Sequence, residues 1–374
     1  MSESPGGRLR ITQIGSRGIP GHRGGVERVI EAVAPRLVKL GHDVTVCCAS
    51  WSAYRQPDFE GVRLRFVGSV RSKYLDTFVR SALATIREIF ESADIVHYHG
   101  SGSAPLALLA RLAGKKVVVT IHGLDWQRQK WNILGHWFLR FGEWAAVRFP
   151  HRTVVVGPAL KQVIDARFHT DVTFIANGVE RRALRAPNKI RQFGVATRDF
   201  ILYLGRLVPE KQCHLLIDAF RRMRARGDIK LVIAGPAWHS VDYFASLRER
   251  ASGDPAIVFA GEVDEDTLEE LYSNCYAYVL PSEVEGMSLA LLDAMAFGAC
   301  VVASDIPANA DVVGTSAVLF RTGSGEDLTA KLDDLVANPE SAEAYRTAAR
   351  ERMTSEYDWD VVTRQWVSLY RSML

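Results

Sequence analysis

Residues 281–305 read PSEVEGMSLALLDAMAFGACVVASD, and this is the most informative stretch of the chain. Glu285 and Gly286 precede an amphipathic helical pattern, and Asp293 follows Glu285 by eight positions. Backbone amides at a helix start bind anions. At ~1.5 Å per residue, Asp293 lies roughly 7 Å into the helix, about the distance from a diphosphate to a ribose. The segment fits a nucleoside diphosphate with Glu285 facing the group beyond it, although an ordinary loop and helix with surface acids fits the spacing equally well.

The composition is that of an ordinary soluble protein with room for two domains, because 48% of the 374 residues are hydrophobic and 24% are charged. No apolar run reaches the ~18 residues that span a bilayer, and residues 1–7 lack the apolar core of a signal peptide. We therefore expect a cytoplasmic protein. The five cysteines are scattered without metal-type spacing, and adjacent Cys47 and Cys48 are expected to be buried thiols.

The net charge of +3 is unevenly distributed. Residues 1–185 contain 27 Lys and Arg against 15 Asp and Glu, a net charge of +12, which leaves −9 for the remainder. A basic first half suits an anionic substrate or the anionic face of a membrane, so we expect peripheral contact with the cytoplasmic face of the inner membrane. A solvated basic surface is the alternative. We expect no nucleic-acid partner.

Strand and helix patterns alternate throughout the chain. An apolar strand at 9–14 is followed by a glycine-rich loop, a helix at 26–40 and a strand at 43–49. Such alternation predicts an α/β fold with parallel sheets covered on both faces. The other predicted strands are 95–98, 117–121, 153–156, 172–175, 200–204, 231–234, 257–260, 277–280, 300–303 and 317–320.

The strands form two series, which a segment rich in Arg, Pro and Asn separates at 183–199. We therefore predict two doubly wound, Rossmann-like domains facing across a cleft, at 1–184 and 185–357, with a terminal helix at 358–374. Open parallel sheets bind ligands beyond the carboxyl ends of their strands. The residues at the ends of predicted strands include His97, His99, His122, Asp125, Asn177, Gly178, Gly205, Arg206 and Gly235.

The stretch Gly205-Arg-Leu-Val-Pro-Glu-Lys-Gln follows the strand at 200–204. Arg206 and Lys211 leave this strand end together. Two fixed cations would stabilise the charge that develops on a diphosphate leaving group, without a metal. A surface loop with two solvated cations is the alternative.

The glycine-rich loop at 15–25 does not match a dinucleotide fingerprint. Its glycines recur about every third residue, and no acid follows the second strand, so a nicotinamide site is poorly supported. Gly24 and Gly25 precede a helix and fit a close approach of phosphate or sugar. A flexible turn is the alternative.

Histidines and acids also stand at other strand ends, where such side chains can serve catalysis or metal binding. His122, with Asp125 close behind it, fits the positioning of a substrate, or a histidine satisfied by backbone. We expect the strand at 95–98 to separate the side chains of His97 and His99, so no metal site is predicted there. Residues 264–266 read Asp-Glu-Asp, an acid pair that a helix cap explains fully.

Residues 126–149 interleave aromatic and basic side chains. Trp137, Phe141 and Trp144 share one face of the predicted helix. Packing in the core is the expected role, and an aromatic, basic surface resting on a membrane is the alternative. The aromatic residues of this stretch are Trp126, Trp131, Trp137, Phe138, Phe141, Trp144 and Phe149, and its basic ones include Arg128, Lys130, Arg140 and Arg148.

Taken together, these features resemble glycosyltransferase family 4, the retaining transferases of the GT-B fold, over nearly the whole chain. The resemblance rests on Gly24-Gly25, His122-Gly, Asn177-Gly-Val, Gly205-Arg206 with Lys211, and Glu285-Gly-Met-Ser through Ala303-Ser-Asp. Residues 15–20 and 122–128 look most like those of bacterial members that build cell-surface polysaccharides, rhamnosyltransferases among them.

The resemblance implies a metal-independent hexosyltransferase without a cofactor, whose co-substrate is a nucleotide-diphosphate sugar and whose acceptor is a glycan or lipid-linked glycan. It implies four catalytic residues, His122, Arg206, Lys211 and Glu285, of which Arg206 and Lys211 bind the diphosphate. The substrate-binding residues that we expect are Gly24, Gly25, Asp125, Gly205, Gly235, Val263, Gly286, Met287, Ser288, Leu289 and Asp293. Of these, Val263 would lie by the base, and Asp293 would bind the ribose although the family usually has glutamate there. Met287 stands where an aromatic residue is usual.

Two other functions fit the same fold. A nucleotide-sugar epimerase would consume the donor without an acceptor. A non-catalytic binding protein would bind the donor but release no nucleotide.

Overall fold

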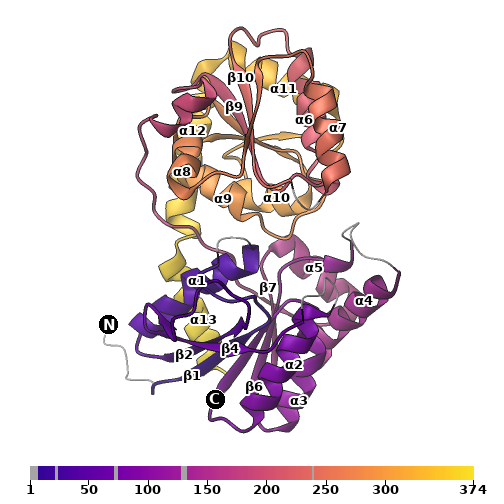
Figure 1. The fold of residues 1–374 in the computed structure, drawn as a ribbon, viewed down its shortest axis with the longest axis vertical. Coiled ribbons are helices and arrows are strands. Elements are labelled where there is room, and N and C mark those ends of the chain that lie inside the picture. Colours follow the sequence, from indigo (N-terminus) through magenta and orange to yellow (C-terminus); the bar gives the residue numbers. More distant parts are fainter. Residues whose placement is uncertain (1–6, 22–23, 71–74, 128–132, 238–239) are drawn as a thin grey trace. The chain divides into compact units, whose positions relative to one another are not determined.

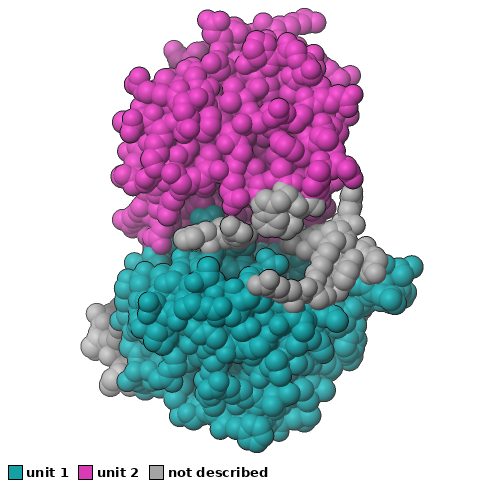
Figure 2. Space-filling view, in the orientation of Figure 1, with its two compact units in different colours: residues 1–177, 359–374 teal, residues 178–358 magenta. Residues whose placement is uncertain are grey.

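The computed structural model describes residues 7–21, 24–70, 75–127, 133–237 and 240–374, and the chain divides into two compact units. Unit 1 comprises residues 1–177 and 359–374, and unit 2 comprises residues 178–358 (Figures 1 and 2). Each unit has its own sheet and its own helices.

Unit 1 is built on an eight-stranded sheet within the described residues, in the order β3-β4-β2-β1-β5-β6-β7-β8. The pair β3–β4 is antiparallel and the other described pairs are parallel. The strands are β1 (Arg10–Ile14), β2 (Asp43–Ala49), β3 (Asp58–Phe59), β4 (Val62–Val67), β5 (Ile95–His99), β6 (Lys116–Ile121), β7 (Arg152–Val155) and β8 (Thr173–Phe174). The helices are α1 (Gly25–Lys39), α2 (Asp76–Ile89), η1 (Ala104–Leu106), α3 (Ala107–Leu112), η2 (Asp125–Gln127), α4 (Ile133–Arg148), α5 (Pro158–Phe168) and α13 (Trp359–Arg371).

Helix α1 illustrates how the helices of unit 1 are formed. Its apolar residues recur every three or four positions, and the buried ones include Val29, Val33 and Leu37. The helix ends before Gly41, whose φ of 89° favours glycine. Helix α13 packs on α1, where Arg36 and Asp360 form an ion pair of 2.9 Å. The C-terminal helix thus completes unit 1.

Unit 2 has a parallel sheet of six described strands in the order β11-β10-β9-β12-β13-β14. The strands are β9 (Phe200–Leu204), β10 (Lys230–Ala234), β11 (Ile257–Gly261), β12 (Ala277–Leu280), β13 (Cys300–Ser304) and β14 (Val318–Phe320). The helices are η3 (Lys189–Phe193), η4 (Pro209–Lys211), α6 (Cys213–Arg222), α7 (Val241–Ala251), α8 (Glu265–Asn274), α9 (Leu289–Ala296), α10 (Pro307–Val313), α11 (Gly325–Ala337) and α12 (Pro339–Glu356).

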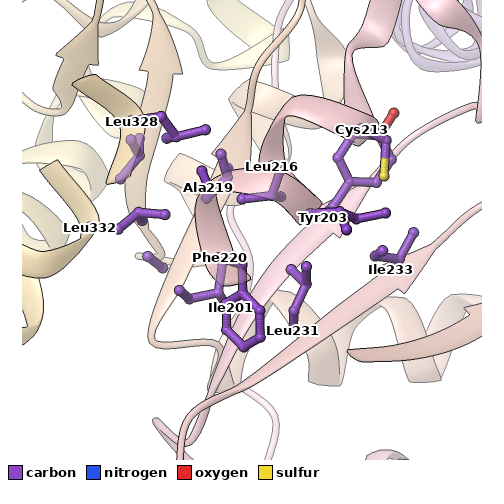
Figure 3. Close-up of a cluster of buried hydrophobic side chains, with 14 of the residues drawn as sticks. Ile201, Tyr203, Cys213, Leu216, Ala219, Phe220, Leu231, Ile233, Leu328 and Leu332 are labelled. Carbon is purple, nitrogen blue, oxygen red and sulfur yellow. The ribbon is translucent and has the colours of Figure 1, made fainter. Parts of the chain in front are cut away.

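The core of unit 2 lies between the sheet and helices α6 and α11 (Figure 3). Ile201 of β9 and Leu231 of β10 meet Phe220 of α6, and Leu328 and Leu332 close the cluster from α11. Each of these side chains is almost fully buried. Removal of such a side chain from water stabilises the fold by about 1.5–3 kcal/mol, so this layer holds the strand ends described below in place.

The predicted α/β class and the two parallel-sheet units are confirmed, and every predicted strand is found with small shifts at its ends. Strand β4 was missed because Arg63 and Arg65 interrupt its apolar residues. Arg65 is nevertheless buried, since its guanidinium binds Glu88 at 2.7 Å and also pairs with Glu91. A strand that contains such a buried, ion-paired arginine does not appear as an apolar run in the sequence.

The sequence predicted a division after residue 184. In the structure, the first division of the chain lies after residue 177. The N–H of Val179 donates to the carbonyl of Tyr357 at 2.7 Å, and Val179 forms a β-bridge with Asp358. Arg182 binds Glu269 of α8 at 2.8 Å. These contacts attach the segment to unit 2. The second division falls one residue later than predicted, after Asp358.

Candidate active site

The neighbouring strands β9 and β12 place two sequence-distant loops together at one edge of the unit 2 sheet. The hydroxyl of Tyr278, on β12, donates to the carbonyl of Leu204 at the end of β9, at 3.2 Å. Beyond the strands, the N–H of Glu283 donates to the carbonyl of Glu210 at 3.0 Å. The loop at 205–212 and the loop at 281–288 are therefore joined by backbone as well as by side chains.

Lys211 and Glu285 form an ion pair across these two loops. Their side chains are only 15% and 10% exposed, so water screens the pair weakly. The hydroxyl of Tyr203 donates to the carbonyl of Arg206 at 3.0 Å and fixes the start of the first loop. The structure thus brings together two of the predicted catalytic residues, Lys211 and Glu285, and sets Arg206 on the same loop as Lys211.

Two predicted binding residues, Gly205 and Gly235, touch each other at the ends of β9 and β10. Gly235 has a φ of 135°, and a Cβ on it would lie 2.0 Å from the carbonyl oxygen of Gly205. The N–H of Gly235 donates to Gly261 at 2.7 Å, and that of Gly205 donates to Ala234 at 3.1 Å. Close packing of strand ends therefore requires glycine at 235, whatever ligand binds nearby.

Helix α9 begins next to the Lys211–Glu285 pair. Ser288 is its N-cap, with its hydroxyl accepting from the N–H of Leu291 at 3.4 Å. Met287 and Ser288 are buried, Gly286 and Leu289 are partly buried, and the first turn carries no acidic side chain. Such a helix start is favourable for an anion.

Asp293 lies in the second turn of α9 and is 7% exposed. Burial raises the pKa of the Tyr278 phenol well above its usual value, and the charges of Glu285 and Asp293 raise it further. Both carboxylates therefore act on the same buried hydroxyl. This common neighbour places the predicted sugar contact and the predicted ribose contact in one region of unit 2.

Val263 is partly buried and lies on the segment between β11 and α8. The acid pair beside it caps a helix, as the sequence predicted. Asp264 accepts from the N–H of Thr267 at 2.8 Å, and Lys189 binds Asp264 and Asp266 at 2.9 and 2.8 Å. Within the residues that the structure describes, no group of three or more His, Cys, Asp and Glu side chains could hold a metal ion.

In unit 1, two acids of α1 accept hydrogen bonds from the backbone of the preceding glycine-rich loop. Glu27 accepts from the N–H of Arg17 at 2.9 Å, and Glu31 accepts from the N–H of Gly21 at 2.8 Å. A Cβ on Gly24 would lie 1.8 Å from a Glu27 carboxylate oxygen. That oxygen is the far end of a flexible side chain, so the contact does not by itself require glycine at 24; Gly25 is exposed.

His122 follows β6 and belongs to a cluster of three histidines that the sequence analysis did not predict. The prediction that β5 separates His97 and His99 is wrong, because residues two apart on a strand share a face. Their ring centroids lie 4.2 Å apart, and His99 Nδ1 lies 3.1 Å from His122 Nε2. Asp125 begins η2, with its N–H donating to Gly123 at 3.0 Å. The i, i+2 spacing was the signal that could have revealed this cluster.

Helix α4 has an exposed aromatic face, so the expectation of core packing for these residues is wrong. Trp137, Phe141 and Trp144 are 67%, 48% and 41% exposed. Trp126 differs, since its indole N–H donates to the buried Glu143 at 2.7 Å. Residues 128–132, which include Arg128, Lys130 and Trp131, lie outside the described residues. Among the helices in the described part of the chain, none has the length and apolar character to cross a membrane.

Two family models match consecutive parts of the chain. Glycosyltransferase Family 4 matches residues 23–182, and Glycosyl transferases group 1 matches residues 186–352. The chain belongs to glycosyltransferase family 4. It is therefore a glycosyltransferase, with the GT-B fold of two Rossmann-like units.

This glycosyltransferase is similar to several curated proteins and solved structures. It is 25% identical to the glycogen synthase of Mycobacterium tuberculosis, with 97% of this chain and 94% of the relative covered. It is also 25% identical to the phosphatidyl-myo-inositol mannosyltransferase of Mycolicibacterium smegmatis, over 94% and 90%. Sucrose-phosphate synthase from Thermosynechococcus elongatus superposes with a TM-score of 0.84 at 19% identity, over 98% and 99%. HepE of Anabaena in complex with UDP-glucose gives 0.80 at 17%, over 98% and 100%.

Proposed function

We propose that this glycosyltransferase acts with retention and moves a hexosyl group from a nucleotide-diphosphate sugar to a hydroxyl of a glycan or lipid-linked glycan. Its role would be the assembly of cell-surface polysaccharide or glycolipid, as in bacterial members that include rhamnosyltransferases. The observation that carries the proposal is the Lys211–Glu285 pair, held at the joined ends of β9 and β12 beside the start of α9. The crystallised complexes of HepE with UDP and with UDP-glucose support the class of donor.

The donor would bind in unit 2 at these loops. Lys211 would exchange its contact with Glu285 for a contact with the diphosphate, and Arg206 would bind the same group. Glu285, released from Lys211, would accept from sugar hydroxyls, and Asp293 would accept from the ribose. The other residues assigned to the donor are Gly205, Gly235, Val263, Gly286, Met287, Ser288 and Leu289, with Val263 by the base.

Chemistry would then proceed at the anomeric carbon without a protein nucleophile. The acceptor hydroxyl attacks on the face that the diphosphate leaves, and a donor oxygen takes its proton. Arg206 and Lys211 stabilise the negative charge on the leaving group, so no metal or cofactor is assigned. His122 is assigned to a sugar hydroxyl, and Gly24, Gly25 and Asp125 are assigned to the substrate region of unit 1.

A thermal-shift screen of nucleotides and nucleotide sugars tests this assignment, because a ligand that binds the folded state raises the melting temperature. We expect one nucleoside diphosphate to stabilise the wild type and to lose that effect with Lys211→Met. The control is Lys189→Met, which removes a lysine paired with Asp264 and Asp266 on the same unit. Equal stabilisation of wild type and Lys211→Met would contradict the role of Lys211.

Product analysis separates transfer from the two alternative functions. A glycosyltransferase releases nucleoside diphosphate in proportion to glycosylated acceptor. An epimerase consumes the donor without acceptor, and a binding protein releases no nucleotide with any acceptor. Either of those results would overturn the proposal.

We propose in addition that the exposed face of α4 rests on an anionic membrane surface at the cytoplasmic side. Trp137, Phe141 and Trp144 recur at helical spacing together with the exposed Arg140 and Arg148. Aromatic and basic side chains on one helix face suit the interface of anionic lipids, and the charge of +12 on residues 1–185 adds attraction.

Sedimentation with lipid vesicles tests the membrane contact. We expect the protein to sediment with phosphatidylglycerol vesicles and not with phosphatidylcholine vesicles, and to lose binding in Trp137→Ser/Phe141→Ser. The matched control is Val241→Ser, which removes a 71% exposed apolar side chain of unit 2. Undiminished sedimentation of the double variant would exclude α4 as the contact.

A further inference from the structure

Buried polar side chains join two neighbouring strands and one helix of unit 2, at the sheet edge that carries the Lys211–Glu285 pair. Ser282 follows β12, Ser304 ends the adjacent β13, and Asn309 lies in α10. All three residues are 0% exposed. The hydroxyl of Ser304 donates to the carbonyl of Ser282 at 2.5 Å, and the side-chain N–H of Asn309 donates to Ser304 Oγ at 3.0 Å. The hydrogen bonds form an Asn309–Ser304–Ser282 relay that ends on the backbone after β12.

Donor and acceptor chemistry fixes the direction of this relay. Nitrogen Nδ2 of an asparagine only donates, so Ser304 Oγ accepts from Asn309. The single hydrogen of the Ser304 hydroxyl is then left for the Ser282 carbonyl. Asn309 Nδ2 also donates to the carbonyl of Ser304 at 3.2 Å, which holds the amide in this orientation, because the flipped amide would place two acceptor oxygens together. Buried hydrogen bonds in series polarise one another, so the loss of one weakens the next.

The relay ends on a peptide group that is held on both sides. The carbonyl of Ser282 and the N–H of Glu283 belong to one planar peptide unit, so their directions are coupled. The carbonyl accepts from the relay, and the N–H donates to the carbonyl of Glu210 at 3.0 Å. Glu210 directly precedes Lys211, and Glu285 stands two residues after Glu283. This one peptide therefore connects the loop of Lys211, the loop of Glu285 and the end of β13.

We propose that Ser304 and Asn309 are positioning residues for the diphosphate and the sugar of the donor. They fix the 282–283 peptide and, through it, the placement of Lys211 against Glu285. The inference rests on the proposed function in one respect, which is that Lys211 and Glu285 bind the donor. Neither Ser304 nor Asn309 has to touch the ligand for this role, because a contact group misplaced by about 1 Å costs up to ~100-fold in rate.

NMR-detected hydrogen exchange of the full chain tests, without any ligand, whether the relay holds this peptide. The amide of Glu283 exchanges only when its bond to Glu210 opens. Ser304→Ala removes the donor to the Ser282 carbonyl. We then expect the Glu283 amide to exchange about tenfold faster, after correction for the change in global stability. Ser304→Cys keeps the shape of the side chain but has only a weak S–H donor, so its exchange rate should lie between those of wild type and Ser304→Ala.

Ser316→Ala is the matched control for a purely structural role. Ser316 is 4% exposed, and its hydroxyl donates to the carbonyl of Val313 in the same unit at 2.6 Å. Its loss should lower stability much as Ser304→Ala does. Exchange at Glu283, the affinity for nucleoside diphosphate and kcat/KM should stay within about twofold of wild type, because this bond shares no atom with the relay. In Ser304→Ala, that affinity and kcat/KM should each fall about tenfold or more.

Three results would overturn the inference. One is equal exchange at Glu283 in wild type, Ser304→Cys and Ser304→Ala. Another is unchanged nucleotide affinity and kcat/KM in Ser304→Ala, and the third is an equal loss of both in Ser316→Ala. Should Ser304→Ala not fold, Ser304→Cys takes its place in each comparison. The exchange data require no substrate, so a failure to find any nucleotide-sugar donor would refute the proposed function, while exchange at Glu283 still decides whether the relay holds the 282–283 peptide.

Discussion

The two clusters at the sheet ends differ in how they are prepared for a ligand. In unit 2, Lys211 and Glu285 form a largely buried ion pair, and we propose that an incoming anion takes the place of Glu285. In unit 1, burial lowers the pKa values of His97 and His99 far below their usual values, so both are neutral at pH 7, and their ring nitrogens contact polar atoms of the same unit. In the unit 2 cluster, charged side chains would change partners when a ligand binds. In the unit 1 cluster, buried hydrogen bonds hold the histidine rings in place. Substitutions in the two clusters should therefore have different effects on activity and stability.

The largest expected effect comes from charge at the unit 2 cluster. Arg206→Ala should lower turnover by ~100-fold or more, because a fixed cation at a developing charge is among the largest catalytic contributions. Steady-state kinetics with the donor found by the thermal screen measures it. Arg224→Ala, which removes an exposed arginine of the same unit, is the control. Near-normal turnover of Arg206→Ala would place the catalytic charge elsewhere.

A backbone change at the same sheet edge should act on stability instead. Gly235→Ala puts a Cβ 2.0 Å from the Gly205 carbonyl at a φ of 135°, so we expect a loss of about 2–4 kcal/mol in unfolding free energy. Gly205→Ala is the matched variant, since its Cβ would meet no atom closer than 3.6 Å. Denaturant unfolding compares the two, and equal losses would refute the close-packing explanation.

Acid should destabilise unit 1 through its neutral histidines. Burial lowers the pKa of His97 to about 3 and that of His99 well below its usual value. Both stay unprotonated when folded but gain a proton when unfolded below pH ~6.5. Their stability contribution is thus full above pH ~6.5 and is lost as the pH falls toward 3, by up to ~1.4 kcal/mol per pH unit for each histidine.

Hydrogen exchange at pH 7 and pH 5.5 measures this effect for each unit. Once corrected for intrinsic exchange rates, protection in β5 and β6 should fall more than protection in β9 and β12. His97→Phe should reduce the difference because Phe binds no proton. An equal fall in both units would show that these histidines do not control acid stability.

The two clusters were unequally visible in the sequence. Apolar runs and turn residues predicted the strand ends that carry Arg206, Glu285 and His122. Such local patterns indicate where strands end. The contact between Lys211 and Glu285 depends on β9 lying beside β12, a pairing of strands that local pattern does not encode. The sequence predicted that Lys211 and Glu285 each lie beyond the end of a strand, but it did not predict that they form an ion pair.

Other parts of the site escaped prediction for equally specific reasons. Gln13 sits within an apolar strand, where a polar residue gives no signal until its partner His99 is known. Gly24 is expected to admit a phosphate, and the structure places the carboxylate of Glu27 beside it. The Gln13–His99 contact joins residues that only tertiary packing brings together, whereas Gly24 and Glu27 are three positions apart at the start of α1. The aromatic face of α4 was predicted to be buried, and this prediction was wrong. The sequence pattern of the helix does not distinguish a buried aromatic face from an exposed one.

The smallest expected effect tests whether the unit 2 pair is exchangeable. Glu285→Gln removes the carboxylate that competes with a diphosphate for Lys211 and keeps the side-chain shape. Binding of the free nucleoside diphosphate should therefore tighten by about fivefold, equivalent to ~1 kcal/mol, because Lys211 no longer has to leave Glu285. Turnover should fall at the same time, since the sugar contact is lost. Isothermal titration measures the affinity, with Glu283→Gln, an exposed acid of the same loop, as the control. Weaker nucleotide binding by Glu285→Gln would mean that Glu285 positions Lys211 for the phosphates, rather than holding it until they arrive.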